Sequence, residues 1–201
     1  MKKILKRMWW LPLLGGIIYF AGYLVVLKLA EKSVPPEFSE ARINGARLAE
    51  EIVATSAYSS QNLEKISRYD AQGDFSEALI LISQEVVKNR DVREKAIQLS
   101  SELEHMAVLI PDIKPAAARE IATEALTSEI ALVSHLISYN DLFSRLFELL
   151  RDKFEGRRSG NPDGEVTSFI IKINEEARAI NDFNSKSSTA LAEFDKIFSS
   201  K

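Results

Sequence analysis

The sequence predicts an all-α protein in which an N-terminal transmembrane helix precedes an elongated antiparallel four-helix bundle. Three observations lead to this fold class. Residues 8–27 contain no charged side chain. Apolar residues recur at spacings of three and four through most of the remaining chain, and glycine and proline gather at three places between these stretches. We therefore divide the chain into a basic start with an anchor (1–30), a juxtamembrane linker (31–37) and a helical bundle (38–201).

The apolar run at residues 8–27 has the length of a membrane span. Twenty helical residues rise about 30 Å, which is the hydrocarbon thickness of a bilayer. Four basic side chains precede the run: Lys2, Lys3, Lys6 and Arg7. The positive-inside rule then predicts a cytoplasmic N-terminus, an extracytoplasmic C-terminal domain and lipid contacts through residues 8–27 at the cell membrane.

A cleaved signal peptide is the alternative to this signal-anchor. Signal peptides have a shorter apolar region, of about 7–15 residues, followed by a small-x-small cleavage site. The best small residue here, Ala30, has Lys28 where the second small residue should stand. An uncleaved anchor is therefore favoured, and a buried helix of a soluble protein is the third interpretation.

The first two bundle helices are expected on either side of Gly73. The first should occupy residues 37–69, since Pro35 and Pro36 break the helix that leaves the membrane. Gly73 fits a helix end, and Asp74 with a Glu three residues later has the spacing of a capped helix start. The apolar repeat of the second helix lapses at residues 88–91. One helix to about residue 110 and two shorter helices are both allowed, and we favour one.

Residues 69–82 resemble the core of a single tetratricopeptide-type repeat, in which Tyr69, Ala78 and Ile82 would pack between paired helices. No second copy follows about 34 residues later, as a repeat array requires. Ordinary packing of a helix pair is therefore the preferred interpretation.

The third and fourth helices are expected on either side of a loop at residues 157–164. Pro111 and Pro115 bracket a turn, and Pro115 suits the first turn of a third helix that ends at Gly156. The fourth helix should run from near Asp163 to about residue 198. Its predicted inner positions follow a seven-residue repeat typical of coiled coils. They are Val166, Ile170, Ile173, Ala177, Ile180, Asn184, Ser187, Leu191, Phe194 and Phe198.

Four long helices joined by short turns form an antiparallel bundle, whose C-terminus returns to the end near the membrane. An N-terminal anchor followed by a long helical bundle resembles the LemA-like membrane proteins. This resemblance is one of architecture and implies no site residues.

Composition excludes several classes of function. All 29 acidic residues follow residue 27, whereas five of the 26 basic residues lie in or beside the anchor, so the rest of the chain carries a net charge of −8 (29 acidic against 21 basic). An acidic domain repels phosphate backbones, and we therefore expect no nucleic-acid partner. The chain has no cysteine, which excludes disulfides and thiolate metal sites. No grouping of nucleophile, base and orienting residue is present, so we expect no enzymatic activity and no cofactor.

Two groups of residues are candidate sites. Glu102 and His105 have the Glu-x-x-His spacing of di-iron bundles, but the other histidine, His135, has Leu132 where a second motif needs a glutamate. We therefore predict no metal site and keep a di-metal enzyme only as a minor alternative.

The second group is polar and falls at inner helix positions. Ser59 and Asn62 interrupt the first helix, while Asn184 and Ser187 lie in the last. If these helices are neighbours, the four residues form a polar layer. Such a layer either fixes the helix register or lines a pocket for a small ligand.

The function that the sequence favours is a single-pass, membrane-anchored bundle that binds or scaffolds another protein at the cell envelope. The alternative is an extracytoplasmic ligand-sensing bundle that signals through a partner. A homo-oligomer is the other association that the sequence allows, since Gly15 and Gly22 lie seven residues apart in the anchor.

Overall fold

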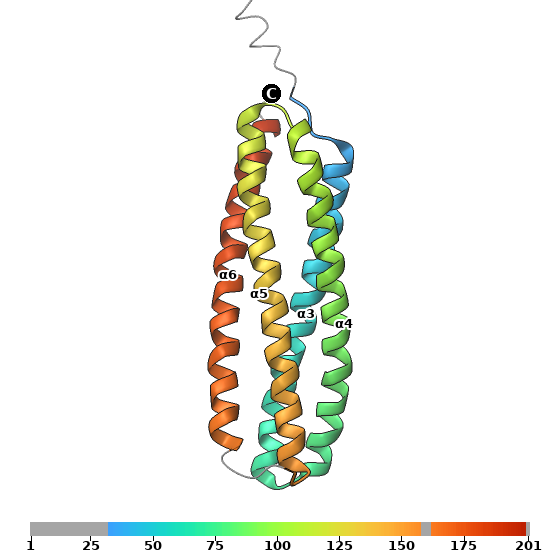
Figure 1. The fold of residues 1–201 in the computed structure, drawn as a ribbon, viewed down its shortest axis with the longest axis vertical. Coiled ribbons are helices and arrows are strands. Elements are labelled where there is room, and N and C mark those ends of the chain that lie inside the picture. Colours follow the sequence, from blue (N-terminus) through green and yellow to red (C-terminus); the bar gives the residue numbers. More distant parts are fainter. Residues whose placement is uncertain (1–31, 158–161, 200–201) are drawn as a thin grey trace, which may run out of the picture.

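The computed structural model describes residues 32–157 and 162–199, which form an elongated antiparallel bundle of four long helices (Figure 1). These helices are α3 (Pro36–Gln72), α4 (Phe75–Leu109), α5 (Ala116–Phe154) and α6 (Pro162–Ser199), and a short 3-10 helix, η1 (Ile110–Asp112), lies between α4 and α5. The predicted four-helix bundle is confirmed.

No helix within these described ranges is both long and apolar enough to cross a membrane. The predicted anchor at residues 8–27 lies outside the residues that the structure describes.

The helix ends follow local turn chemistry. Gly73 adopts a left-handed conformation with φ 73°, and its N–H donates to the carbonyl of Asp70. One residue later, the Asp74 side chain accepts a hydrogen bond from the Glu77 backbone N–H and caps α4. At the other hairpin, α5 ends at Phe154 just before Gly156, which also has a positive φ. These are the ends that the sequence predicted.

Helix α4 continues without a break through residues 88–91. Two residues in and beside this stretch, Asn89 and Val92, are buried. The lapse in the apolar repeat therefore marks a polar layer inside the bundle, and the prediction of a single second helix is confirmed.

Two apolar clusters make up the core. The larger lies near the end where the chain enters and leaves the bundle, and the smaller lies near the α3–α4 hairpin. Ala78 and Ile82 are fully buried in the smaller cluster and Tyr69 packs against it, which confirms the predicted packing of this helix pair. Buried polar residues separate the two clusters along α3, α4 and α5: Ser59, Asn62, Glu85, Asn89 and Asn140.

The four helices do not close into an evenly packed ring. Helix α3 packs on α4, α4 on α5, and α5 on α6, whereas α3 and α6 approach each other far less closely. The chain enters α3 and leaves α6 at the same end of the bundle (Figure 1). There, the ammonium of Lys32 donates to the carbonyl of Ile197 at 2.7 Å. A hydrogen bond therefore joins the two sides of the α3–α6 interface at this end, whereas the helices are loosely packed along the rest of the interface.

Candidate binding sites

The predicted single polar layer is instead two separate clusters. Asn62 on α3 donates to Glu85 on α4 at 2.7 Å, whereas Ser187 on α6 donates to Glu129 on α5 at 3.0 Å. Asn184 is exposed. Asn62 and Ser187 thus each pair with a glutamate across their own hairpin, and Ser59 is buried on α3.

A simple signal in the sequence could have found these pairs. In an antiparallel hairpin, residues at equal distances from the turn lie opposite each other. Asn62 and Glu85 are 11 and 12 residues from Gly73, and Ser187 and Glu129 are equally distant from residue 158. Both glutamates were absent from the set of candidate residues because charged side chains are rarely buried.

The loose interface between α3 and α6 contains three cavities, which we call together the α3–α6 seam. The cavities have volumes of about 650, 440 and 210 Å³, and side chains of both helices line each one. Seven of the ten inner positions predicted for α6 line these cavities. They are Val166, Ile170, Asn184, Ser187, Leu191, Phe194 and Phe198.

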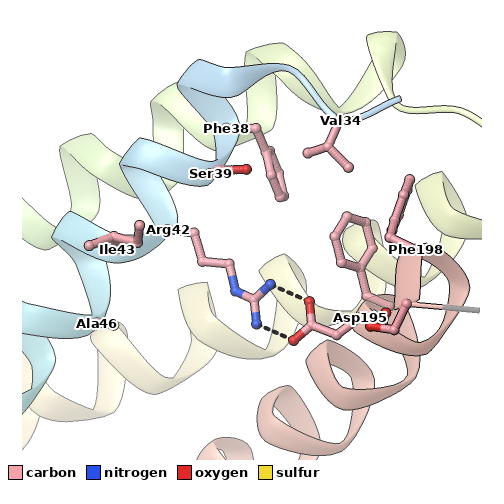
Figure 2. A pocket seen from close by; sticks show the side chains of 10 residues that line it. Val34, Phe38, Ser39, Arg42, Ile43, Ala46, Asp195 and Phe198 are labelled. Atoms are coloured by element: carbon pink, nitrogen blue, oxygen red, sulfur yellow. Dashed lines mark hydrogen bonds and ion pairs between the residues drawn. The ribbon is translucent and has the colours of Figure 1, made fainter. Parts of the chain in front are cut away.

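An ion pair joins the two sides of the seam near the chain ends. The guanidinium of Arg42 on α3 donates two hydrogen bonds, of 2.7 and 2.9 Å, to the two carboxylate oxygens of Asp195 on α6 (Figure 2). The bond from Arg42 holds the pKa of Asp195 below its ordinary value. This fork fixes the separation of the helices beside the 650 Å³ cavity.

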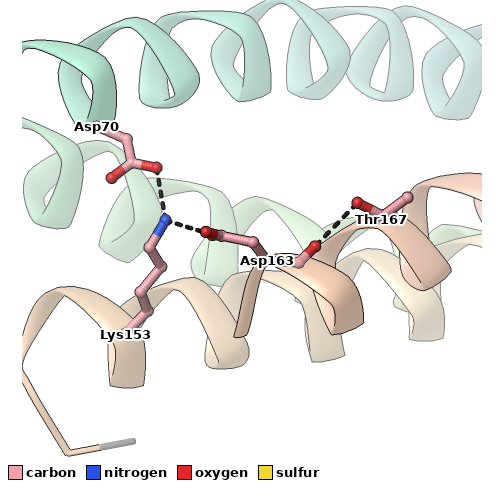
Figure 3. Close-up of polar contacts among 4 residues, drawn as sticks. All are labelled: Asp70, Lys153, Asp163 and Thr167. Carbon is pink, nitrogen blue, oxygen red and sulfur yellow. Dashed lines mark hydrogen bonds and ion pairs between the residues drawn. The ribbon is translucent and has the colours of Figure 1, made fainter. Parts of the chain in front are cut away.

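A second ionic contact joins the seam at the opposite end. The ammonium of Lys153 on α5 lies between Asp70 of α3 and Asp163 of α6, at 2.7 and 2.9 Å (Figure 3). Burial alone would lower the pKa of Lys153, but the two hydrogen bonds raise it above its ordinary value. The seam is therefore held by charge at both ends.

The cavity of about 440 Å³ between these two ionic contacts is the central cavity. Its floor is formed by apolar side chains of α4 and α5, and small residues line its α3 side. Glu129 lies at its edge, where burial raises the pKa of its carboxyl group despite the hydrogen bond from Ser187 and the nearby charge of Arg42. An apolar space of this volume with a few polar groups is typical of a small-molecule site.

The buried polar cluster around Glu85 has different properties. Glu85 and Asn62 are both 0% exposed, and the ammonium of Lys88 donates to the same glutamate oxygen at 3.1 Å. Lys88 also lies over the ring of Tyr58, 3.6 Å from its centroid. The second carboxylate oxygen of Glu85 and the amide nitrogen of Asn89 have no hydrogen-bond partner within the described ranges. The residues of this cluster line none of the three cavities of the α3–α6 seam, and we assign the cluster to the register of the helices.

The outer face of α4 carries a row of exposed apolar side chains, which we call the α4 stripe. It consists of Ile80 (51% exposed), Val87 (61%), Ile97 (58%) and Val108 (70%). At 3.6 residues per turn they fall within an arc of roughly 100° and extend over about 42 Å. Exposed apolar side chains on one helix face are a candidate contact site for another macromolecule, here as four single residues that lie 7, 10 and 11 residues apart.

The residues considered for a metal site do not come together. His105 is exposed on α4, whereas His135 on α5 contacts Glu176 of α6 at 2.6 Å and stacks on Phe183. Across residues 32–157 and 162–199, no group of three or more histidine or acidic side chains could hold a metal ion.

Comparison of the chain with protein-family models, with curated proteins and with solved structures finds no match. Function is therefore inferred from the geometry of the α3–α6 seam and the α4 stripe.

Proposed function

We propose that the chain is a single-pass membrane protein whose bundle lies outside the cytoplasm and acts as a protein-binding or scaffolding module at the cell envelope. The observation that carries this proposal is the α4 stripe. Its four branched apolar side chains are more than half exposed, although the two core clusters on the inner side of the same helix are well packed. Covering the stripe with a partner would remove this surface from water.

The orientation of the bundle is consistent with such a role. Residues 8–27 supply the anchor, and the basic residues before it keep the N-terminus inside. Since the chain enters and leaves the bundle at one end (Figure 1), the long axis extends away from that end. The α4 stripe runs along this axis, where a partner can lie beside it.

Photocrosslinking in intact cells tests this proposal. A photoreactive amino acid placed at Val87 or Ile97 should give discrete adducts with a protein partner. The same group at Lys172 or Glu175, which are exposed on α6, is the control and should give none. In each probe-carrying protein, replacing the two neighbouring residues of the α4 stripe by serine should reduce the adducts without lowering thermal stability. Adducts with lipid alone, or the same adducts from both faces, would refute the proposal.

Topology needs its own experiment. Protease added to intact cells should digest the bundle while the N-terminal segment stays with the membrane fraction. If digestion needs the membrane to be broken, opening only an outer barrier distinguishes a shielded bundle from an inverted orientation. A shortened soluble product would instead indicate a cleaved signal peptide.

Ligand sensing is a second candidate function, and the central cavity is the observation that favours it. A ligand that joins α3 to α6 there would change how tightly the seam is held, and a partner on the bundle could respond to that change.

A further inference from the structure

The central cavity combines an apolar interior with a carboxylate that is only partly paired. Leu99, Leu103 and Met106 of α4 form its floor, and Leu191 of α6 contributes to its wall. Glu129 accepts one hydrogen bond, from Ser187, and within the described part of the chain its other oxygen accepts none. The site thus offers an apolar surface and a hydrogen-bond acceptor side by side.

We propose that the central cavity binds a cationic amphiphile, a molecule with a single apolar chain and an amine head. The apolar chain lies against Leu103 and Met106, and the ammonium pairs with Glu129. This inference rests on the second candidate function and names its class of ligand. It is independent of the α4 stripe.

The shape of the site favours a chain-like ligand. On its α3 side the cavity is lined from Arg42 to Val53, which at 1.5 Å per residue is about 16 Å along the helix. The lining from α3 includes three small residues, Gly45, Ala46 and Ala49, and the lining from α6 includes Leu191. Since Leu103 and Met106 are core residues, a ligand reaching them gains dispersion contacts and removes apolar surface from water.

The charges around the site favour an amine head. Three ionisable side chains line the cavity: Arg42, Glu50 and Glu129. Arg42 forms two hydrogen bonds with Asp195 and its charge also acts on Glu129. Counting Asp195, three carboxylates face one guanidinium, which is a net charge of −2. A fatty acid would add a further negative charge. A long-chain alcohol could donate a hydrogen bond to Glu129 but would leave its charge unbalanced.

The environment of Glu129 strengthens the case for a cation. Burial raises the pKa of its carboxyl group, which indicates poor hydration of the charged form. An ion pair formed in such surroundings is screened less than one in open water. The amine would thus replace part of the hydration that the carboxylate has lost.

The experiment uses the full-length chain in lipid nanodiscs and three diazirine probes of equal chain length: dodecylamine, dodecanol and dodecanoic acid. Peptide mass spectrometry locates the labelled residues. We expect the amine to label the peptides that contain Met106 and Leu191, and soluble hexylamine to compete with it.

Three variants make the test specific. Glu129→Gln keeps the size and the acceptor for Ser187, and should reduce amine labelling by roughly tenfold or more, the scale of a lost charge-assisted hydrogen bond. Glu148→Gln, an exposed position on the same helix, is the matched control and should change nothing. Ala49→Phe fills the cavity and should reduce labelling by all three probes. Far-UV circular dichroism verifies that each variant is folded.

The outcomes separate the ligand class from the existence of a site. If the alcohol or the acid labels the cavity as well as the amine does, and Glu129→Gln has no effect, the amine specificity is wrong although the cavity binds ligands. If no probe labels these peptides, or Ala49→Phe changes nothing, both the inference and the sensing function are refuted. Neither result bears on crosslinks from the α4 stripe.

Discussion

Replacing Asn62 with leucine removes the closest hydrogen-bond donor of a fully buried carboxylate. Asn62 donates to Glu85 at 2.7 Å, and Lys88 donates to the same oxygen at 3.1 Å. The other oxygen of Glu85 is buried without a partner among the described residues. A hydrogen bond from a neutral donor to a charged group contributes about 1.5–3 kcal/mol. Since Lys88 remains, we expect Asn62→Leu to lower the free energy of unfolding by about 2 kcal/mol.

Two further variants turn this loss into a measurement of the pair. Glu85→Leu leaves the amide of Asn62 without its acceptor and should cost about 1–3 kcal/mol, the usual cost of an unsatisfied buried group. The double variant removes both polar groups and should be close to the wild type, because apolar replacement of a buried pair is often neutral or stabilising. The coupling free energy is the sum of the two single losses when the double variant is neutral, and should therefore be about 3–5 kcal/mol, at or above the upper end for neighbouring residues.

Urea unfolding of the full-length chain in mild detergent, followed by far-UV circular dichroism, measures these free energies. Asn181→Leu, at an exposed position on α6, is the matched control and should change stability by less than about 0.5 kcal/mol. Equal slopes of free energy against urea concentration would show that the variants unfold from similar states. If the losses of the two single variants simply add, Asn62 and Glu85 do not act as a pair and the reasoning is wrong.

Three other predictions can be checked by thermal unfolding. Gly45→Ala should stabilise the protein by up to about 1 kcal/mol through helix propensity, because the Leu99 methyl that a Cβ would meet at 3.3 Å borders the central cavity and can move into it; a lower Tm would contradict this. Since burial raises the pKa of Glu129, the folded state holds this proton more tightly than the unfolded state. Stability should therefore fall as pH rises from the ordinary carboxyl pKa to the raised one, and Glu129→Gln should remove this fall, whereas an unchanged pH profile would exclude Glu129 as its source. Arg42→Gln should cost no more than about 1 kcal/mol, since Asp195 is largely exposed, and a larger loss at high salt would show that packing, not charge, accounts for the effect.

The sequence predicts the helices and their ends well because the signals are local. Gly73 has no side chain and therefore adopts a φ of 73° without strain. Asp74 caps α4 through a backbone N–H of that same helix. A turn of this kind depends on a few consecutive residues. Its position can therefore be predicted without any knowledge of the neighbouring helices.

Contacts between helices were harder to predict because they depend on the position of each residue along the long axis of the bundle. Ser59 and Asn62 were expected to meet Asn184 and Ser187, yet Asn62 and Ser187 each bond a glutamate across their own hairpin and Asn184 is exposed. The seven-residue repeat identifies the inward face of a helix but does not say which residue lies opposite. That information comes from the distance to the turn, and it would have placed both Glu85 and Glu129 beside their partners.

The predicted inner positions of α6 also explain why its repeat does not produce an evenly packed core. Ile173 and Phe194 are buried, whereas Ile170 and Asn184 are exposed and border the α3–α6 seam. A repeat alone cannot reveal this difference, because it depends on the size of the side chains across the interface.

Small side chains on α3 are what leave the central cavity open. Ala49 and Leu191 both line this cavity, and a larger residue at position 49 would bury more apolar surface and increase stability. The ionic contacts at the two ends hold the helices in place without such filling. The proposed amphiphile would use both features of this cavity, its volume of about 440 Å³ and the carboxylate of Glu129 in its lining.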